Sequence, residues 1–334
     1  MSSSVKTLFL PFESGARGWP SGTERVAFLN AQLPDVADDM RRSLDCEQGH
    51  RAGFLHLQRA GFAVKPELPD LDVCAGCLVL AGKHRAENQM MIARAGRMVR
   101  PGGFVAVAGD KNLGIASLRK WAASRVEIAG SLAKHHATVF WFTVGSGAPF
   151  SDIAEATETV DDRFQTAPGM FSSGKVDPGS ALLASHFDKR ISGQVADFGC
   201  GWGFLSARLL EAAKPERLAL YEAHWPSLRA AERNLEAFSR DVAIEANWFD
   251  LSSEPVARQF DWIVMNPPFH SGRASEPDLG KAFIAAASRA LKPNGRLLMV
   301  ANRKLPYEQA LAQGFRRVVP IVEADGFKVV EAVR

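Results

Sequence analysis

The side chains best suited to chemistry follow a short apolar run, Phe260–Met265, in the order Asn266, Pro267, Pro268 and Phe269. Two consecutive prolines stop a strand, remove two N–H donors and leave carbonyl oxygens beside an amide and an aromatic ring. The side-chain oxygen of Asn266 and the carbonyl of Pro267 can accept both hydrogens of an exocyclic amine on a flat ring, while Phe269 stacks on that ring. An amine held in this way can attack an electrophilic methyl group, which requires alignment rather than a strong base. The alternative is an ordinary turn after a strand, which such residues often form.

A glycine loop stands upstream, between a strand expected over Gln194–Phe198 and a helix expected over Phe204–Ala213. Its glycines alternate with other residues: Gly199, Gly201 and Gly203. Such a loop lets a ligand approach the backbone at the start of a helix. A dinucleotide site shows Gly-x-Gly-x-x-Gly, whereas this loop is preceded by an acid, Asp197, in the order Asp-x-Gly-x-Gly-x-Gly. The acid favours a ligand with a cationic amino-acid end over a phosphate.

Two further acids follow predicted strands. Glu222 ends the run Arg217–Tyr221, where ribose hydroxyls are held in related sheets, and Asp250 follows Ala246–Phe249, where it can accept from an adenine amino group. Either acid alone is as readily explained as a solvated loop residue. Three acids at three successive strand ends indicate one ligand site.

Together these residues resemble the class I S-adenosylmethionine-dependent methyltransferases that act on exocyclic or amide nitrogens. Closer features are similar to the ribosomal RNA guanine-N2 methyltransferases of the RsmC type. They are Pro168–Ser172, Asp177-x-Gly179-Ser180, His270 after the Asn-Pro-Pro-Phe, Val300–Asn302 and Leu305–Tyr307. The resemblance is close over roughly the second half of the chain and loose over the first.

The resemblance implies roles for individual residues. For the cofactor, S-adenosyl-L-methionine with S-adenosyl-L-homocysteine as product, the implied contacts are Asp197, Gly199, Gly201, Gly203, Glu222, Asp250 and Asn266. The implied catalytic residues are Asn266, Pro267 and Phe269, and the implied substrate contacts are Phe269, His270 and Phe171, with Ser172 closing over the site. Two departures are the Glu at position 222, where the family more often has Asp, and the large Trp202 within the glycine loop, which either faces the ligand or packs inward.

The chain has 334 residues, of which 46% are hydrophobic and 23% charged, which is typical of a soluble protein with two domains. No apolar run has the length of a membrane span, and the first residues lack a secretion-signal pattern. Four cysteines do not form a disulfide framework in a chain of this size, and Cys74-x-x-Cys77 lacks the further ligands of a zinc site. We therefore expect a cytoplasmic monomer without metal or membrane contact, with buried thiols and with His135-His136 at the end of a helix.

Predicted strands alternate with amphipathic helices, for example over Pro226–Phe238 and Lys281–Leu291, which indicates mostly parallel sheets covered on both faces. At the C-terminus, Phe315–Glu323 and Phe327–Val333 are expected to form an antiparallel hairpin through Asp325-Gly326. The predicted fold class is α/β, with two tandem doubly wound, Rossmann-like methyltransferase domains.

The first half repeats part of the second. Arg97–Lys111 can be aligned with Arg289–Arg303 without a gap, both as a helix end, a Pro-Gly turn and a buried strand, and Cys77–Leu80 corresponds to Trp262–Met265. Where the second half has Asn-Pro-Pro-Phe, however, the first has Ala-Gly-Lys-His. We interpret this as a duplication in which one copy lost its site. The alternative is chance similarity, because a helix end followed by a Pro-Gly turn and a strand is common in α/β folds.

The expected division is a degenerate domain over residues 1–145, a linker within Thr143–Pro149 and a catalytic domain over 151–334. Residues 1–150 carry 18 Lys and Arg against 13 Asp and Glu, while the remainder carries 22 against 24, so the first half is the basic one. A basic half favours contact with a phosphate backbone. The candidate cations are Arg41, Arg42, Arg94, Arg97, Arg100, Arg119, Lys120 and Arg125.

The reaction expected from this pattern transfers a methyl group to the exocyclic N2 of a guanine in small-subunit (16S) ribosomal RNA, so that the partner is this RNA or the small ribosomal subunit. The same pocket chemistry suits adenine N6 in nucleic acid or a glutamine amide in a protein. A third hypothesis, from another class, is a non-catalytic RNA-binding or assembly factor.

Overall fold

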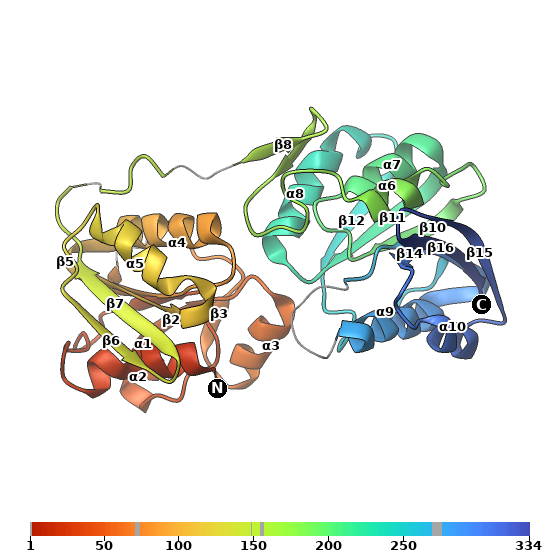
Figure 1. The fold of residues 1–334 in the computed structure, drawn as a ribbon. Helices are drawn as coiled ribbons and strands as arrows, with labels where there is room; N and C mark the ends of the chain where they lie inside the picture. The colour runs from red at the N-terminus through yellow and green to blue at the C-terminus, as the bar shows by residue number, and fades with distance from the viewer. Residues whose placement is uncertain (1, 71–73, 148, 154–156, 269–275) are drawn as a thin grey trace. The chain divides into compact units, whose positions relative to one another are not determined.

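The computed structural model describes residues 2–70, 74–147, 149–153, 157–268 and 276–334. The chain divides into two compact units, Met1–Ala156 and Thr157–Arg334 (Figure 1). The division lies beyond the expected linker because the residues after that linker still pack on the first unit. The ring of Phe150 lies 5.5 Å from that of Trp121 and 5.8 Å from that of Phe142.

The first unit is built on a seven-stranded sheet with the order β3-β2-β1-β4-β5-β7-β6. Its strands are β1 (Val26–Leu29), β2 (Leu44–Glu47), β3 (Ala63–Lys65), β4 (Cys74–Leu80), β5 (Val99–Asp110), β6 (Gly130–Lys134) and β7 (Ala137–Thr143). Its helices are α1 (Ser3–Glu13), α2 (Asp38–Ser43), α3 (Arg51–Arg59), α4 (Arg85–Met98), the 3-10 helix η1 (Lys111–Leu113) and α5 (Ile115–Ala123). The strands pair in parallel except where β7 joins β5 and β6.

A hydrophobic core lies on each face of this sheet because side chains alternate along the strands. From β4, Cys77 and Val79 pack with residues of α4 and α5, whereas Leu78 and Leu80 pack with residues of α1. The strand is therefore apolar throughout, as expected of a central parallel strand covered on both sides.

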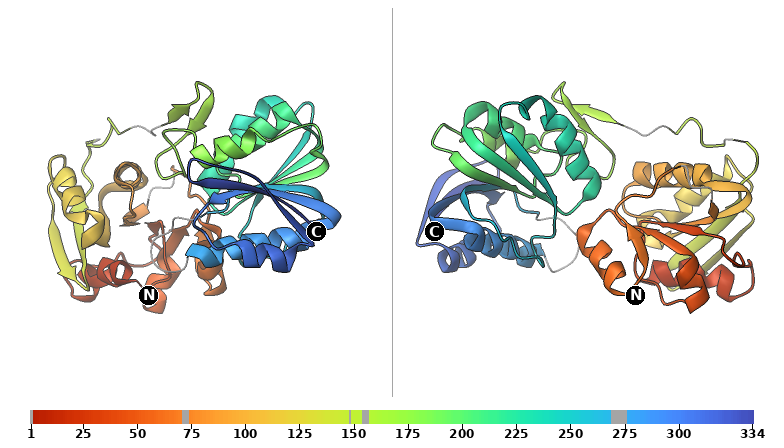
Figure 2. Two further views of the ribbon diagram at one scale, coloured as in Figure 1. Left: turned by 45° about the vertical axis from the view of Figure 1, so that its right-hand side comes forward. Right: turned by 180° about the vertical axis from the view of Figure 1, so that it is seen from behind.

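The second unit has the same strand order, β12-β11-β10-β13-β14-β16-β15. Its strands are β10 (Ser192–Phe198), β11 (Lys214–Glu222), β12 (Ala243–Trp248), β13 (Phe260–Met265), β14 (Leu291–Asn302), β15 (Arg317–Ala324) and β16 (Phe327–Val333), preceded by the small hairpin β8 (Glu158–Val160) and β9 (Phe164–Thr166). Its helices are α6 (Pro178–Ala184), α7 (Phe204–Ala212), α8 (Trp225–Leu235), the 3-10 helix η2 (Glu236–Phe238), α9 (Glu276–Ala290) and α10 (Glu308–Gly314). Figure 2 shows α9 and α10 below this sheet and α7 and α8 above it. The prediction of two tandem, mostly parallel α/β sheets with a C-terminal antiparallel hairpin is confirmed.

The correspondence between the halves extends to a detail of register. β5 and β14 each have 12 residues, and each shifts register against its neighbouring strand near its start. At that point stand Gly103 and Gly295, where an added Cβ would lie 2.5 Å from the carbonyl oxygen of Ala75 and 3.0 Å from that of Phe260. The Pro-Gly segment expected as a turn is therefore a bulge inside the strand.

The expectation that His135-His136 ends a helix is wrong. These residues form the turn between β6 and β7, with φ of 54° and 61°, and Asp325-Gly326 forms the matching turn between β15 and β16, with φ of 51° and 83°. Two consecutive left-handed residues form the two-residue turn whose twist matches that of a hairpin. All four cysteines are buried and free. In the described part of the chain, no helix has both the length and the apolar character that crossing a membrane requires.

Candidate active site

The glycine loop joins β10 to α7 at the carboxyl edge of the second sheet. Gly199, Gly201 and Gly203 have φ of 78°, 55° and 93°, a region that L side chains rarely adopt. A Cβ at Gly203 would also lie 3.2 Å from the Cα of Ala231 in α8. Glycine is therefore required for the chain to leave the strand and enter α7 this tightly.

Asp197 stands before the loop, and its side chain has 0% exposure. Ser206 of α7 donates its hydroxyl to Oδ2 at 2.7 Å, whereas Oδ1 has no hydrogen-bond partner. Burial raises the pKa of this carboxyl to about 7, the hydrogen bonds of Ser206 oppose that rise, and the charge of Glu222 adds to it. A buried acid with an unpartnered oxygen suits a cationic ligand group, which would favour the ionised form.

Glu222 ends β11, as predicted, and its carboxylate braces the glycine loop. Oε2 accepts from the backbone N–H of Gly201 at 2.8 Å, and Oε1 accepts from that of His224 at 2.8 Å. These bonds fix the direction of the side chain and tie the loop to the neighbouring strand. The loop and the second acid thus form one assembly.

Asp250 lies just beyond β12 and is buried, but its carboxylate is engaged in its own turn. Oδ1 accepts from the N–H of Ser252 at 3.0 Å and from its hydroxyl at 2.6 Å, and Oδ2 accepts from the hydroxyl of Ser253 at 2.6 Å. Asp250 therefore shapes the end of the strand whatever else it binds.

Asn266 stands at the end of β13, beside the glycine loop. Its Nδ2 donates to Oδ2 of Asp177 at 3.0 Å and to Oγ of Ser180 at 2.8 Å, while its Oδ1 is buried without a partner. Pro267 is buried and Pro268 exposed. Phe269 and His270, which the sequence assigns to the substrate, lie outside the described residues.

Trp202 packs inward, which resolves the question raised by its size. Its indole is 4% exposed, lies 5.1 Å from the ring of Phe164 and 5.8 Å from that of Phe204, and donates Nε1–H to the carbonyl of Phe171 at 2.9 Å. Phe171 itself is 54% exposed, and Ser172 after it has a φ of 54°. Trp202 thus anchors the segment that presents Phe171.

These elements surround one hollow. Three segments line it: the stretch before α6, the glycine loop with the first turn of α7, and the end of β13. The lining residues are Phe171, Ser172, Asp177, Ser180, Gly199, Cys200, Gly201, Trp202, Phe204, Leu205 and Asn266. The structure thus brings Phe171, two of the glycines and Asn266 together. Asp197 precedes the loop, Glu222 bonds to Gly201 within it, and Asp250 follows the neighbouring strand β12, so the three acids do not line the hollow itself. Among the described residues, no three His, Cys, Asp or Glu side chains gather as metal ligands.

The two residues that bond to Asn266 had no predicted role. Asp177 and Ser180 bond to Asn266 across 89 and 86 positions of sequence. The signal available in the sequence was the Asp-x-Gly-Ser pattern, which by itself indicates a helix cap.

Comparison with known proteins identifies the family of the chain. A family model, the methyltransferase small domain, matches residues 161–331. The curated "Ribosomal RNA small subunit methyltransferase C" of Sodalis glossinidius is 30% identical over 90% of this chain and 88% of its own, and that of Salmonella arizonae is 28% identical over 90% of both.

A solved structure from T. thermophilus is described as "16S rRNA N2 G1207 methyltransferase (RsmC) in complex with AdoMet and Guanosine". It is 25% identical to this chain, with a TM-score of 0.80 over 99% of this chain and 91% of that one. The resemblance inferred from the motifs is confirmed over nearly the whole length. The chain belongs to the ribosomal RNA small subunit methyltransferase C family of S-adenosylmethionine-dependent methyltransferases.

Proposed function

We propose that this chain transfers a methyl group to the exocyclic N2 of a guanine in 16S ribosomal RNA. The observation that carries the proposal is the side-chain oxygen of Asn266, which is buried without a partner in a residue that lines the glycine-loop hollow. A buried acceptor without a donor costs free energy unless a ligand supplies the donor. The relative from T. thermophilus, described with AdoMet and guanosine, supports a guanine as the source of that donor.

The residues at the loop fit the cofactor. S-adenosylmethionine supplies an electrophilic methyl group on a sulfonium and carries a cationic amino-acid end. We propose that Asp197, whose Oδ1 is unpartnered, faces a cationic part of it, and that the glycines allow its close approach. Glu222 is proposed to accept from the ribose hydroxyls. Asp250 is proposed at the adenine end, where we expect the smallest contribution because its oxygens already accept from two serines.

The acceptor amine is proposed to be held by two oxygens, Oδ1 of Asn266 and the carbonyl of Pro267. Both accept hydrogen bonds from the amine and direct its lone pair, so that the chain contributes orientation and electrostatics rather than a strong base. Phe269 and His270, outside the described residues, and Phe171, exposed beside the hollow, are proposed to contact the base. The base must leave its pairing partner to enter such a site.

We further propose that residues 1–145 form a degenerate, non-catalytic domain that contacts RNA and that 151–334 form the catalytic domain. The protein is proposed to be a monomer, and to be cytoplasmic because its proposed substrate is ribosomal. Half of the cations suggested for RNA contact are already paired: Arg94 with Glu47 and Asp70, Arg97 with Asp70, Arg100 with Glu24 and Arg125 with Asp152. The exposed pair Arg119 and Lys120 on α5 is the better candidate.

The test is a transfer assay with tritiated methyl donor on free 16S RNA, small ribosomal subunits, DNA and a release-factor protein, followed by nucleoside analysis. We expect label in N2-methylguanosine from one of the two ribosomal substrates. Label in N6-methyladenosine or in the protein would instead identify one of the other acceptors. No transfer to any substrate by a protein that binds the cofactor would contradict the catalytic proposal.

A further inference from the structure

The side-chain amide of Asn266 is bonded on its nitrogen side only. Nδ2 donates one hydrogen to Asp177 at 3.0 Å and the other to Ser180 at 2.8 Å, so both donors of the amide are used within the protein. The oxygen on the other side is buried and has no partner. The nitrogen therefore has its hydrogen bonds within the protein, whereas the oxygen is left to accept one from a ligand.

The chemical identity of the two partners determines whether the nitrogen or the oxygen of the Asn266 amide faces the ligand. An ionised carboxylate accepts hydrogen bonds and cannot donate them. If the amide turned over, Oδ1 of Asn266 would face Oδ2 of Asp177, and two acceptors would meet without a hydrogen between them. The nitrogen would then point at the incoming amine, where two donors would meet. Orientation of this one amide thus decides between attraction and repulsion of the target group.

The local sequence explains how a helix end reaches the end of β13. Asp177 is the N-cap of α6 and accepts from the N–H of Ser180 at 2.8 Å, and Pro178 occupies the first turn, where it is tolerated. At Gly179 an added Cβ would lie 2.8 Å from the ring of Phe327, so only glycine lets the helix approach β16 this closely. Each residue of Asp177-Pro-Gly-Ser180 therefore helps to place the carboxylate and the hydroxyl against Asn266.

We propose that Asp177 and Ser180 are positioning residues that lock the Asn266 amide with its oxygen toward the acceptor amine. This inference rests on the proposed function, because it needs an amine at Asn266. Neither residue is proposed to touch the methyl group or the amine. Their proposed effect on turnover passes through Asn266, which separates the lock from the role of Asp177 as the N-cap of α6.

The first experiment removes the hydroxyl of Ser180. Ser180→Ala keeps the helix cap, because the cap uses the backbone N–H of Ser180. We expect kcat to fall about tenfold, while the KM for RNA and the Kd for the cofactor change less than twofold. The matched control is Ser185→Ala at the other end of α6, whose exposed hydroxyl donates to the carbonyl of Leu182 at 2.8 Å. Its kcat should stay at the wild-type value, and a fall equal to that of Ser180→Ala would overturn the proposal.

The second experiment tests the route of the effect. In an Asn266→Ala background, Ser180→Ala should change kcat less than twofold, because the group that it positions is gone. An undiminished tenfold loss in that background would show that Ser180 acts elsewhere and would reject the lock. Asp177→Asn retains an acceptor oxygen and should keep kcat within about threefold, whereas Asp177→Ala should lose more than Ser180→Ala. Melting temperatures of all variants separate a loss of folding from a loss of turnover.

A third readout needs no turnover. The side-chain NH2 of Asn266 should exchange slowly with solvent in the wild type and at least tenfold faster in an Asp177→Ala, Ser180→Ala double variant, with the exposed Asn112 as the internal reference. Equal exchange at Asn266 and Asn112 in the wild type would refute the lock. A wild type that forms no N2-methylguanosine but protects the Asn266 amide would refute the proposed substrate and retain the lock, so the two failures are distinguishable.

Discussion

The two sheets have the same strand order, but the carboxyl edges of their central strands differ. Phe28 pairs with Cys46 in β2, and Asp197 pairs with Leu220 in β11. Three residues further along, the N–H of Ala31 donates to the carbonyl of Glu47 at 2.8 Å, and the N–H of Cys200 donates to that of Tyr221 at 3.1 Å, so these positions correspond. By this count Phe28 stands in the place of Asp197, and Gln48 in the place of Glu222.

The third position follows from the neighbouring strands. Phe28 pairs with Leu78 in β4, and Asp197 pairs with Val264 in β13, so Leu80 at the end of β4 corresponds to Asn266 after β13. An acid, a second acid and an amide in the second unit are thus an aromatic residue, an amide and an aliphatic residue in the first. All three positions proposed to bind cofactor or base have changed chemical type.

The first unit satisfies its own polar groups at this edge. Gln48 donates Nε2–H to the carbonyl of Ala31 at 2.7 Å, and its oxygen accepts from the N–H of His50 at 2.7 Å. Among the described residues, the buried side-chain oxygens without a partner belong to Asp197, Asn266 and Tyr307, all in the second unit. The comparison teaches that buried side-chain oxygens left without partners indicate the retained site better than the shared fold does.

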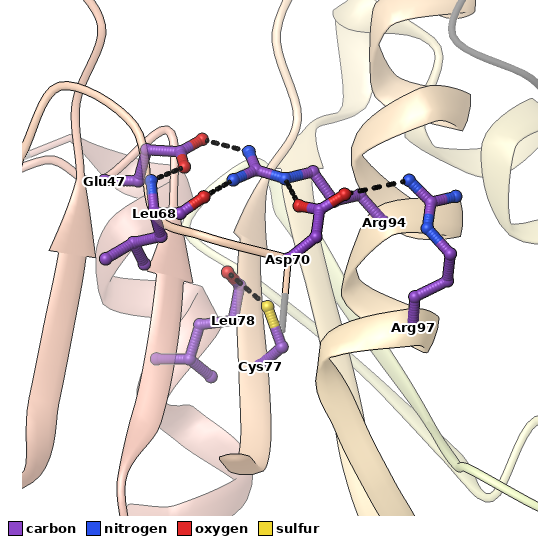
Figure 3. Close-up of polar contacts among 7 residues, drawn as sticks. All are labelled: Glu47, Leu68, Asp70, Cys77, Leu78, Arg94 and Arg97. Atoms are coloured by element: carbon purple, nitrogen blue, oxygen red, sulfur yellow. Dashed lines mark hydrogen bonds and ion pairs between the residues drawn. The ribbon is translucent and has the colours of Figure 1, made fainter. Parts of the chain in front are cut away.

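Figure 3 shows how the first unit occupies the space beyond β2. Arg94 of α4 lies between Glu47 and Asp70, with Nη1 at 2.7 Å from Oε1 of Glu47, and Arg97 reaches Asp70 from the same helix. The two carboxylates raise the pKa of Arg94 against the opposing effect of its burial. The charges of this network are paired within the unit, so the network serves the fold rather than a ligand.

The largest effect should come from removing the side-chain amide of Asn266, at the position where the first unit has the aliphatic Leu80. Asn266→Ala removes the proposed acceptor of the target amine, and we expect kcat to fall about a thousandfold while the cofactor Kd changes less than threefold. Single-turnover transfer and calorimetric titration measure the two quantities. Asn112→Ala, at an exposed position of the first unit, is the control. Equal losses in turnover and in cofactor affinity would contradict the assignment of Asn266 to the amine.

The second change replaces the acid at position 197 by an apolar residue, because the first unit has the apolar Phe28 at the corresponding position. Asp197→Leu removes the buried carboxylate that is proposed to face a cationic part of the cofactor, and we expect cofactor affinity to fall about a hundredfold. Calorimetric titration measures the loss, with the exposed Asp241→Leu as the control for the same substitution. Unchanged affinity in a folded variant would refute the role of Asp197.

The carboxyl of Asp197 also predicts a pH dependence of stability, which the apolar residue at the corresponding position of the first unit does not produce. In the folded chain without cofactor its pKa is about 7, against an ordinary value of 3.8 in the unfolded chain. Since the raised pKa favours the protonated folded form, this contribution to stability is full below about pH 4 and is lost as pH rises through about 7. The slope within that window is about 1.4 kcal/mol per pH unit.

Cofactor affinity should change in the opposite direction, because the ionised carboxylate is the binding form. We expect affinity about tenfold weaker at pH 6 than at pH 8. Asp197→Asn should flatten both profiles. A wild-type affinity that does not change over this range would show that the carboxylate is already ionised or not involved.

The sequence predicted the parts of the site that depend on neighbouring residues. A strand, a glycine loop and a helix in succession, or two strands joined through Asp325-Gly326, are encoded locally, and the structure has them where they were expected. Contacts between distant segments were not predictable. Asp177 meets Asn266 only after α6 packs on β16, and Asp250 closes on its own serines although its position in the sequence resembles that of Glu222. The turn at His135 was missed because its left-handed backbone is carried by two histidines rather than by the usual Asn-Gly.

The smallest predicted effect tests whether every buried oxygen without a hydrogen-bond partner indicates a functional site. Tyr307 is fully buried, its hydroxyl has no partner, and a Cβ added at Gly280 of α9 would lie 1.9 Å from that hydroxyl, which therefore sits against the backbone of a helix rather than in the hollow. Tyr307→Phe removes an unsatisfied buried group without changing the shape of the side chain. We expect it to raise the free energy of unfolding by about 1 kcal/mol and to leave turnover within twofold. Urea unfolding and the transfer assay measure both quantities. A tenfold loss of turnover would add Tyr307 to the site. A buried oxygen without a partner would then indicate function even away from the carboxyl edge at which the two units differ.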